Sequence, residues 1–258
     1  MISLLRGLRN NLLAERRLTR YLLYALGEIV LVVIGILIAL QVNTWNEERK
    51  RGLERLELLG ALQSDLSTTR VLLDEGMAQS AKGIRRMEQF LNAVGTNPEG
   101  YPVDSLQYWA GGAFDAVFVD PVLTTYNEAV STGRISLVQD AELLDQLASF
   151  IRANSFYQVH LNFTGEIYYL GAIYDLRRQV GNLGVLGGPV FDRTFKRNLT
   201  YPRYNLSDSE FYNLIERPEN YAAIDNMLDA QYMIRDILGE MDSALKAAQS
   251  RLETLTGN

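Results

Sequence analysis

The feature that most constrains this chain is an uninterrupted apolar run near its N-terminus. Residues 21–42 read YLLYALGEIVLVVIGILIALQV, and no charged residue lies between Glu28 and Glu47. About 20 such residues, in a helix rising about 1.5 Å per residue, cross a bilayer core of about 30 Å. Helices in globular cores are rarely apolar on every face over this length. The run therefore predicts one transmembrane helix over residues 21–45.

The flanks of the run favour a membrane anchor over a cleaved signal peptide. Tyr21, Tyr24 and Trp45 lie near its two ends, where amphipathic aromatic side chains prefer the headgroup layer. The chain continues TWNEERK, which contains no small-residue cleavage site. Residues 1–20 place leucines on one helical face and arginines on the other, which predicts a basic amphipathic juxtamembrane segment. A frayed tail is the alternative for this segment.

The distribution of charge bears on orientation and on partners. Residues 1–20 hold five arginines and one glutamate, a charge of +4, so the remainder of a chain with net charge −6 carries −6 − 4 = −10. Four basic residues also follow the run closely, so the positive-inside rule favours a cytoplasmic N-terminus only slightly. On that basis we expect a bacterial inner-membrane protein with a periplasmic body, residues 46–258. Its acidic charge argues against nucleic acid as a partner.

The sequence contains few residues that could form a catalytic, metal-binding or phosphate-binding site. It has no cysteine and a single histidine, His160, which excludes disulfides, thiolate sites and two-histidine metal sites. The glycine-rich stretch GNLGVLGGP lacks both a preceding strand pattern and the lysine of a phosphate-binding loop, so it is expected to be a loop. We therefore expect a non-enzymatic protein with no catalytic, metal-binding or cofactor-binding residues and no cofactor.

One face of the predicted membrane helix has the composition of a helix–helix contact. It is formed by Glu28, Val32, Gly35 and Ala39. Their spacing of four, three and four residues places them on one side of a helix. Small residues such as Gly35 and Ala39 allow close backbone approach, and an ionisable group such as Glu28 is costly in lipid unless it has a partner. Self-association through this face is expected, with a Glu28 side chain that reaches the headgroups as the alternative.

Two segments resemble a known family. Residues 21–50, YLLYALGEIVLVVIGILIALQVNTWNEERK, resemble the opening of an uncharacterised family of single-pass membrane proteins from Gram-negative bacteria, described only as a domain of unknown function. Residues 125–150, TYNEAVSTGRISLVQDAELLDQLASF, are similar to a second segment of that family. The resemblance implies a membrane anchor and a helical body, and it brings no catalytic residues.

The body shows helical periodicity in three long stretches. The first has apolar residues every three or four positions from Leu56 to Val94. The second begins at Asp140, a good N-cap, and extends to about Gln179. The third begins at Pro218 and carries a near-strict heptad, listed as Met227, Gln231, Ile234, Leu238, Met241, Leu245, Ala248, Leu252 and Leu255.

These stretches predict an all-α fold, in which the transmembrane helix is followed by an elongated antiparallel bundle of three long helices. A fourth is expected if the first stretch breaks near Gly76, and Gly83 is a second position at which it could kink or break. The final heptad could instead form a coiled coil between chains. Two insertions are expected.

The first insertion, residues 95–139, contains a short helix over 104–109 and a second helix that starts at Asp120–Pro121 and ends at Gly133. The second insertion, residues 181–217, contains a loop and then a capping box formed by Ser207 and Glu210.

Tyrosines gather in the second and third stretches and in the loop between them. Tyrosine buries a large area and keeps a polar end, so it is enriched at interfaces. The residues expected on a partner surface are Tyr157, Tyr168, Tyr169, Tyr174 and Tyr232. We therefore expect a membrane-anchored interaction or assembly protein whose partners are membrane lipid, its own copies and an unnamed protein. The alternative is a domain that binds or senses a small molecule between its helices.

Overall fold

The computed structural model describes residues 17–115, 117–171, 173–179 and 206–257. Helices account for the regular structure of these residues, which contain no β-strand, so the all-α prediction is confirmed for them. The amphipathic segment expected at the N-terminus lies largely outside the described residues, and so does most of the loop expected after residue 180. The chain divides into two compact units, Met1–Glu57 and Leu58–Asn258.

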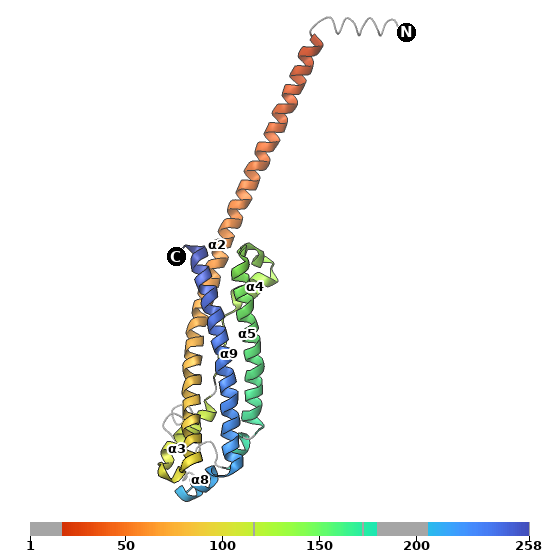
Figure 1. Cartoon of the computed structure of the whole chain (residues 1–258). Coiled ribbons are helices and arrows are strands. Elements are labelled where there is room, and N and C mark those ends of the chain that lie inside the picture. Colours follow the sequence, from red (N-terminus) through yellow and green to blue (C-terminus); the bar gives the residue numbers. More distant parts are fainter. Residues whose placement is uncertain (1–16, 116, 172, 180–205, 258) are drawn as a thin grey trace, which may run out of the picture. The chain divides into compact units, whose positions relative to one another are not determined.

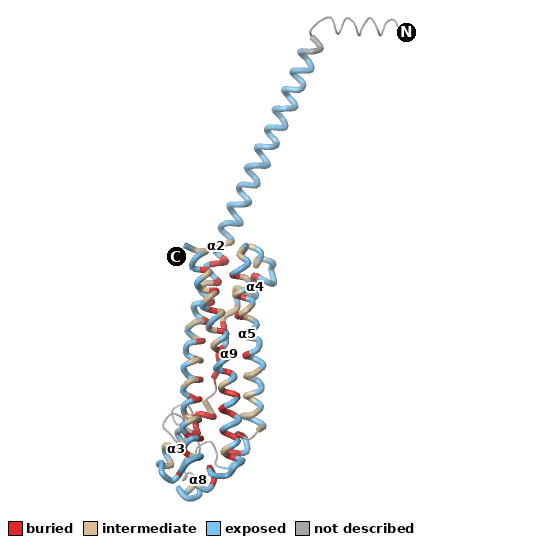
Figure 2. The backbone as a smooth tube through the Cα atoms, viewed as in Figure 1, coloured by how far each residue is buried: buried red, intermediate tan, exposed pale blue. Residues whose placement is uncertain are grey.

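The first unit contains the beginning of helix α2, which extends over Arg17–Thr96 (Figure 1). Every side chain from Arg20 to Glu54 is exposed (Figure 2), although residues 29–46 are uncharged and mostly apolar. Within the described part of the chain, α2 is the one helix long and apolar enough to cross a membrane. Residues 46–57, expected to belong to the body, fall into this first unit.

The second unit is built on three long helical segments that lie side by side: residues 58–96 of α2, α5 (Ala141–Tyr169) and α9 (Pro218–Thr256). Helices α2 and α5 run in the same direction, and α9 runs opposite to both (Figure 1). The expectation of an antiparallel arrangement therefore does not describe the α2–α5 pair. The heptad of α9 faces the interior of this unit, where eight of its nine positions are buried and Leu255 is partly buried.

Shorter elements cover the two ends of the second unit. At one end lie a 3-10 turn (Pro98–Gly100), α3 (Val103–Ala110), a second 3-10 turn (Gly111–Phe114) and α8 (Asp208–Ile215). At the other end lie α4 (Thr124–Ser131) and a 3-10 segment (Arg134–Val138). Residues 173–179 are also helical. Asp140 caps α5 by accepting a hydrogen bond from the Leu143 N–H at 2.8 Å, and Ser207 and Glu210 form the expected capping box of α8.

Two sequence predictions of element boundaries were wrong, and one alternative that the sequence left open was decided. Helix α5 ends at Tyr169 rather than near Gln179, because the chain turns at Leu170 and Gly171, whose N–H groups both donate to the carbonyl of Glu166. Helix α4 begins at Thr124 rather than at Pro121. Helix α2 passes through Gly76 and Gly83 without a break, so neither glycine divides it.

The extended segment, which consists of residue 115 and residues 117–123, explains why these glycines are present. It connects the two ends of the second unit and lies against α2, where Thr69, Gly76 and Gly83 recur every seven residues on one helical face. A Cβ atom on Gly76 would lie 2.3 Å from a γ-methyl of Val119. The helix therefore needs glycine at position 76 for room, and not for flexibility.

Polar side chains of α2 bind the C-terminal end of the extended segment, next to the start of α4. The Thr69 hydroxyl accepts a hydrogen bond from the Val122 N–H at 2.9 Å. The Asp65 carboxylate accepts one from the Thr125 N–H at 2.8 Å, so a distant residue caps the start of α4. The backbone N–H groups of Val119 and Val122, on either side of Asp120 and Pro121, donate to Tyr157 and Thr69, which explains why no helix starts there.

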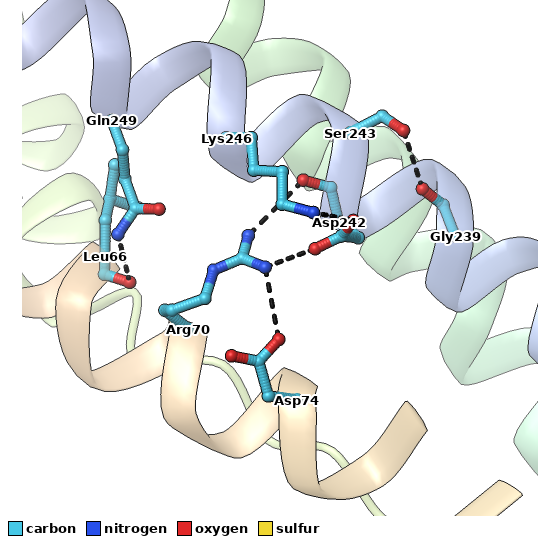
Figure 3. A network of polar contacts seen from close by, with 8 residues as sticks. All are labelled: Leu66, Arg70, Asp74, Gly239, Asp242, Ser243, Lys246 and Gln249. Carbon is cyan, nitrogen blue, oxygen red and sulfur yellow. Dashed lines mark hydrogen bonds and ion pairs between the residues drawn. The ribbon is translucent and has the colours of Figure 1, made fainter. Parts of the chain in front are cut away.

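Ion pairs fasten the long helices to one another. Arg70 of α2 pairs with Asp242 of α9 and lies 3.3 Å from Asp74, and Lys246 reaches the other oxygen of Asp242 at 2.8 Å (Figure 3). Burial alone would raise the pKa of Asp242, but the hydrogen bonds from Lys246 and Arg70 outweigh it and hold that pKa below its usual value. Arg251 of α9 similarly pairs with the α5 cap Asp140 at 2.7 Å.

We expect Gly76→Ala to destabilise the protein by about 1–3 kcal/mol, because the new methyl group overpacks the contact with Val119. The matched control is Gly60→Ala in the same helix, where a Cβ would meet no atom within 4 Å. That change should stabilise by about 0.5–1 kcal/mol through helix propensity. Urea unfolding of the full-length protein in mild detergent, followed by circular dichroism, measures both. Equal effects at the two glycines would contradict the described position of the extended segment.

Candidate functional site

Tyr157, expected on a partner surface, is instead a buried structural residue. Its side chain has 0% exposure, and its hydroxyl bridges the extended segment. The hydroxyl accepts a hydrogen bond from the Val119 N–H at 3.1 Å and donates one to the Val117 carbonyl at 2.9 Å. Burial raises the pKa of Tyr157 above its ordinary value, which keeps the proton needed for donation. This assignment to a surface was wrong because a helix periodicity does not reveal what a non-helical segment will cover.

The other four tyrosines do not gather at one place. The rings of Tyr168 and Tyr169 meet edge to face, with centroids 4.7 Å apart, at the end of α5. Tyr169 and Tyr174 are exposed, whereas the Tyr232 hydroxyl donates to the carboxylate of Glu88 and so ties α9 to α2. Only Tyr168 and Tyr169 of the expected set therefore share one site in the structure.

A second group of exposed side chains, on and near α5, is apolar and contains none of the tyrosines expected on a partner surface. We call it the α5 face, and it consists of Phe156, Val159, Phe163, Leu170 and the neighbouring Met233 of α9. Phe156, Val159 and Phe163 are separated by three and four residues, so they lie on one side of the helix, and Leu170 lies in the turn that follows α5. All five side chains are exposed, with Phe163 at 58% and Leu170 at 80%. Contiguous exposed apolar side chains of this kind mark interaction sites in soluble domains.

The α5 face borders a hollow of about 730 Å³ between α5 and α9. Val159, Phe163 and Met233 form part of its apolar lining. Polar groups on its edge come from His160, Thr164, Asn226 and Asp229. Exposed aromatic rings beside an apolar hollow are features that a docking helix or loop commonly uses.

A second depression, the Gln231 groove, has a volume of about 860 Å³. Its walls come from the residues just before and within the extended segment, from α5 and the turn after it, and from α9. Phe114, Phe118, Leu161 and Met227 are among its apolar lining residues, and Tyr168 and Tyr169 stand at one side. In the described part of the chain, no group of His, Cys, Asp and Glu side chains has the arrangement of a metal site.

The predicted contact face of the apolar helix is on the surface of the first unit. Glu28, Val32, Gly35 and Ala39 are all exposed on α2, and a Cβ on Gly35 would meet no atom within 4 Å. Nothing in the described chain covers this face, so it is open to another helix.

Comparison with known families gives one result. The model of a family of unknown function, DUF6090, matches residues 28–217, more than half of the chain. The chain belongs to the DUF6090 family. The predicted resemblance to an uncharacterised family is thereby confirmed, although membrane attachment is not part of the DUF6090 description. No curated protein and no solved structure gave a significant match.

The DUF6090 match ends at Arg217, the residue before α9. The matched region therefore includes Phe156, Val159, Phe163 and Leu170 of the α5 face, but neither Met233 nor Gln231. The sequence carried a signal for this face, because residues 156–163 read FYQVHLNF with apolar side chains at helical spacing on two sides of the helix. The periodicity of the buried side obscured it.

We expect Tyr157→Phe to destabilise the protein by about 1–3 kcal/mol, because it leaves a buried N–H and a buried carbonyl without their partner. Tyr169→Phe, at an exposed tyrosine of the same helix, is the control and should change stability by less than about 0.5 kcal/mol. Thermal unfolding of the two full-length variants distinguishes them. A neutral Tyr157→Phe would show that the hydroxyl bridge contributes nothing to the fold.

Proposed function

We propose that this protein is a membrane-anchored, non-enzymatic helical protein that associates with copies of itself. The observation that carries the proposal is the exposed α5 face, which the described residues leave uncovered although its members are apolar. In the proposed arrangement α2 crosses the bacterial inner membrane once over residues 21–45, with a cytoplasmic N-terminus and a periplasmic body. Full exposure of the apolar run supports this, since water would be an unfavourable surrounding for it.

The area of the α5 face fits a contact between tethered copies. An aromatic side chain presents about 150–250 Å² when fully exposed, so five partly exposed apolar residues offer on the order of 500 Å². A two-fold contact would bury this area on both copies, in total on the order of 1,000 Å². That value lies near the lower limit for a specific interface between freely diffusing proteins.

Anchoring compensates for the small area. Two copies held in one membrane meet at a high effective concentration, so a second weak contact adds to the first without a new loss of translational freedom. The face formed by Glu28, Val32, Gly35 and Ala39 would supply the contact in the membrane, and the α5 face would supply the contact outside it. The apolar members of the α5 face contain no charge, so two identical faces can meet without like-charge repulsion.

Cysteine cross-linking tests the contact outside the membrane. Phe163 lies midway between Phe156 and Leu170 in the sequence, so in a two-fold contact it should meet the same residue of the other copy. The chain has no native cysteine, so Phe163→Cys gives an unambiguous disulfide readout. We expect rapid dimer formation upon mild oxidation in lipid bilayers.

The matched control for this experiment is Gln158→Cys, an exposed position on a different side of α5 that lines neither depression. It should cross-link at least about tenfold more slowly. Equal rates at the two positions would show that the copies collide at random and that the α5 face is not an interface.

Substitution in the apolar helix tests the contact in the membrane. Gly35→Ile should weaken self-association, because the larger side chain separates two backbones that a glycine lets approach. The expected loss is on the order of 1 kcal/mol, and Glu28→Leu should lose somewhat less. Val33→Ile, off this face, should change little. Förster transfer between labelled copies in vesicles measures the association. An unchanged dimer population in Gly35→Ile would remove this face from the proposal.

One observation favours a second candidate function, the binding of a small molecule. The Gln231 groove is larger than the hollow beside the α5 face, and it combines apolar walls with a few polar groups, as ligand sites commonly do.

A further inference from the structure

Gln231 is a polar residue at a buried position of helix α9. It occupies a position of the α9 heptad between Met227 and Ile234, where the other members are apolar and buried. Its side chain is only 5% exposed. A buried amide without hydrogen bonds is costly, so such groups are almost always paired.

The structure gives this amide no partner within the described residues: no hydrogen bond of the Gln231 side chain is formed to any of them. The fully enclosed polar side-chain atoms without a partner belong to Ser80, Gln146 and Asn154, and Gln231 is not one of these. Its amide therefore keeps access to open space, and the space that Gln231 lines is the groove. The groove thus presents one unpaired donor and one unpaired acceptor inside an apolar wall.

The charges around the groove restrict what can bind. No lysine or arginine is found among the described residues that line it, and the guanidinium of Arg177 is stacked on the ring of the lining residue Tyr168, 4.8 Å from its centroid. Asp115 lines the groove, but its carboxylate is paired with Arg86 at 2.5 Å. Glu166 is the remaining acid and disfavours a second negative charge nearby.

We propose that the Gln231 groove is a binding site for a small, uncharged, largely apolar molecule that carries an amide-like hydrogen-bonding group. The apolar part lies against Phe114, Phe118 and Met227, and its polar group pairs with the amide of Gln231. An amide ligand satisfies both the donor and the acceptor of Gln231, which an apolar molecule cannot do. This site goes beyond the proposed self-association and does not depend on it.

One residue that lines the groove can be replaced by a larger residue that would fill it. Gly165 of α5 is a lining residue, and a Cβ placed on it would meet no atom within 4 Å. A phenylalanine at this position can therefore extend into the groove without a clash at its base. Gly239 of α9 is the matched control, because it is also helical and has the same free space, but it does not line the groove.

The test uses two probes with the same ring system, 2-naphthamide and 2-naphthoate, titrated calorimetrically into the full-length protein with identical detergent in cell and syringe. The wild type should bind 2-naphthamide at one site per chain, and 2-naphthoate at least about tenfold more weakly. Gly165→Phe should abolish binding of 2-naphthamide, and Gly239→Phe should bind it as the wild type does. Failure of the wild type to bind 2-naphthamide, or equal binding by the two glycine variants, would overturn the proposal.

Gln231→Leu isolates the role of the amide. The leucine retains an apolar wall and removes the hydrogen bonds, so affinity for 2-naphthamide should fall about two- to tenfold, as expected for a neutral hydrogen bond. The thermal midpoint of the unliganded variant should rise, because an unpaired amide no longer has to be buried. Unchanged affinity would show that the amide of Gln231 does not bind the ligand. A loss of affinity together with a lower midpoint would show that Gln231 stabilises the fold instead. The dimer readout at Phe163→Cys is independent of these results.

Discussion

The close approach of the extended segment to α2 is the contact on which the rest of the second unit depends. It is possible because Gly76 has no side chain where Val119 must pack. Once the segment lies there, it returns the chain from one end of the unit to the other, so that α5 can run in the same direction as α2. The Tyr157 hydroxyl then satisfies both an N–H and a carbonyl of this non-helical backbone, which would otherwise be buried unpaired.

The same contact creates the candidate ligand site. Residues before and within the extended segment form one wall of the Gln231 groove, and α5 and α9 form the others. Three continuous helices would pack their apolar stripes directly against one another and leave little space between them. An extended chain is narrower than a helix and does not fill a helix-sized position along its whole length. A groove beside it is therefore a consequence of the architecture.

Much of the helical framework could be predicted from the sequence, because its signals are local. The side chains of Asp140 and Ser207 cap the helices that follow them, so the sequence predicts both helix starts. The heptad of α9 identifies the buried face of that helix, whatever packs against it. The path of residues 117–123 could not be predicted in this way. Its contacts join Val119 and Val122 to residues about 40 to 50 positions away, and glycine in a helical pattern more commonly indicates a break than a space for another segment.

The candidate sites also differ in whether a local sequence signal could predict them. Tyr157 carried a surface signal because tyrosine is common at interfaces, but its burial is decided by a segment that shows no periodicity. Gln231 was visible in the sequence as one polar member of an apolar heptad, and only the fold shows that this polar group lines a groove.

Helix α5 shows how the two proposed surfaces are related. Its apolar side chains extend around more of the helix than α9, α2 and the extended segment cover. On one side, Leu161 and Tyr168 lie at the Gln231 groove, and on another, Phe156 and Phe163 lie on the exposed face. A helix that only completed a core would carry polar residues at Phe156 and Phe163, since exposed aromatic rings add nothing to the stability of a lone chain. This arrangement of α5 supports both proposals, in which a second copy covers the exposed face and a small molecule occupies the groove.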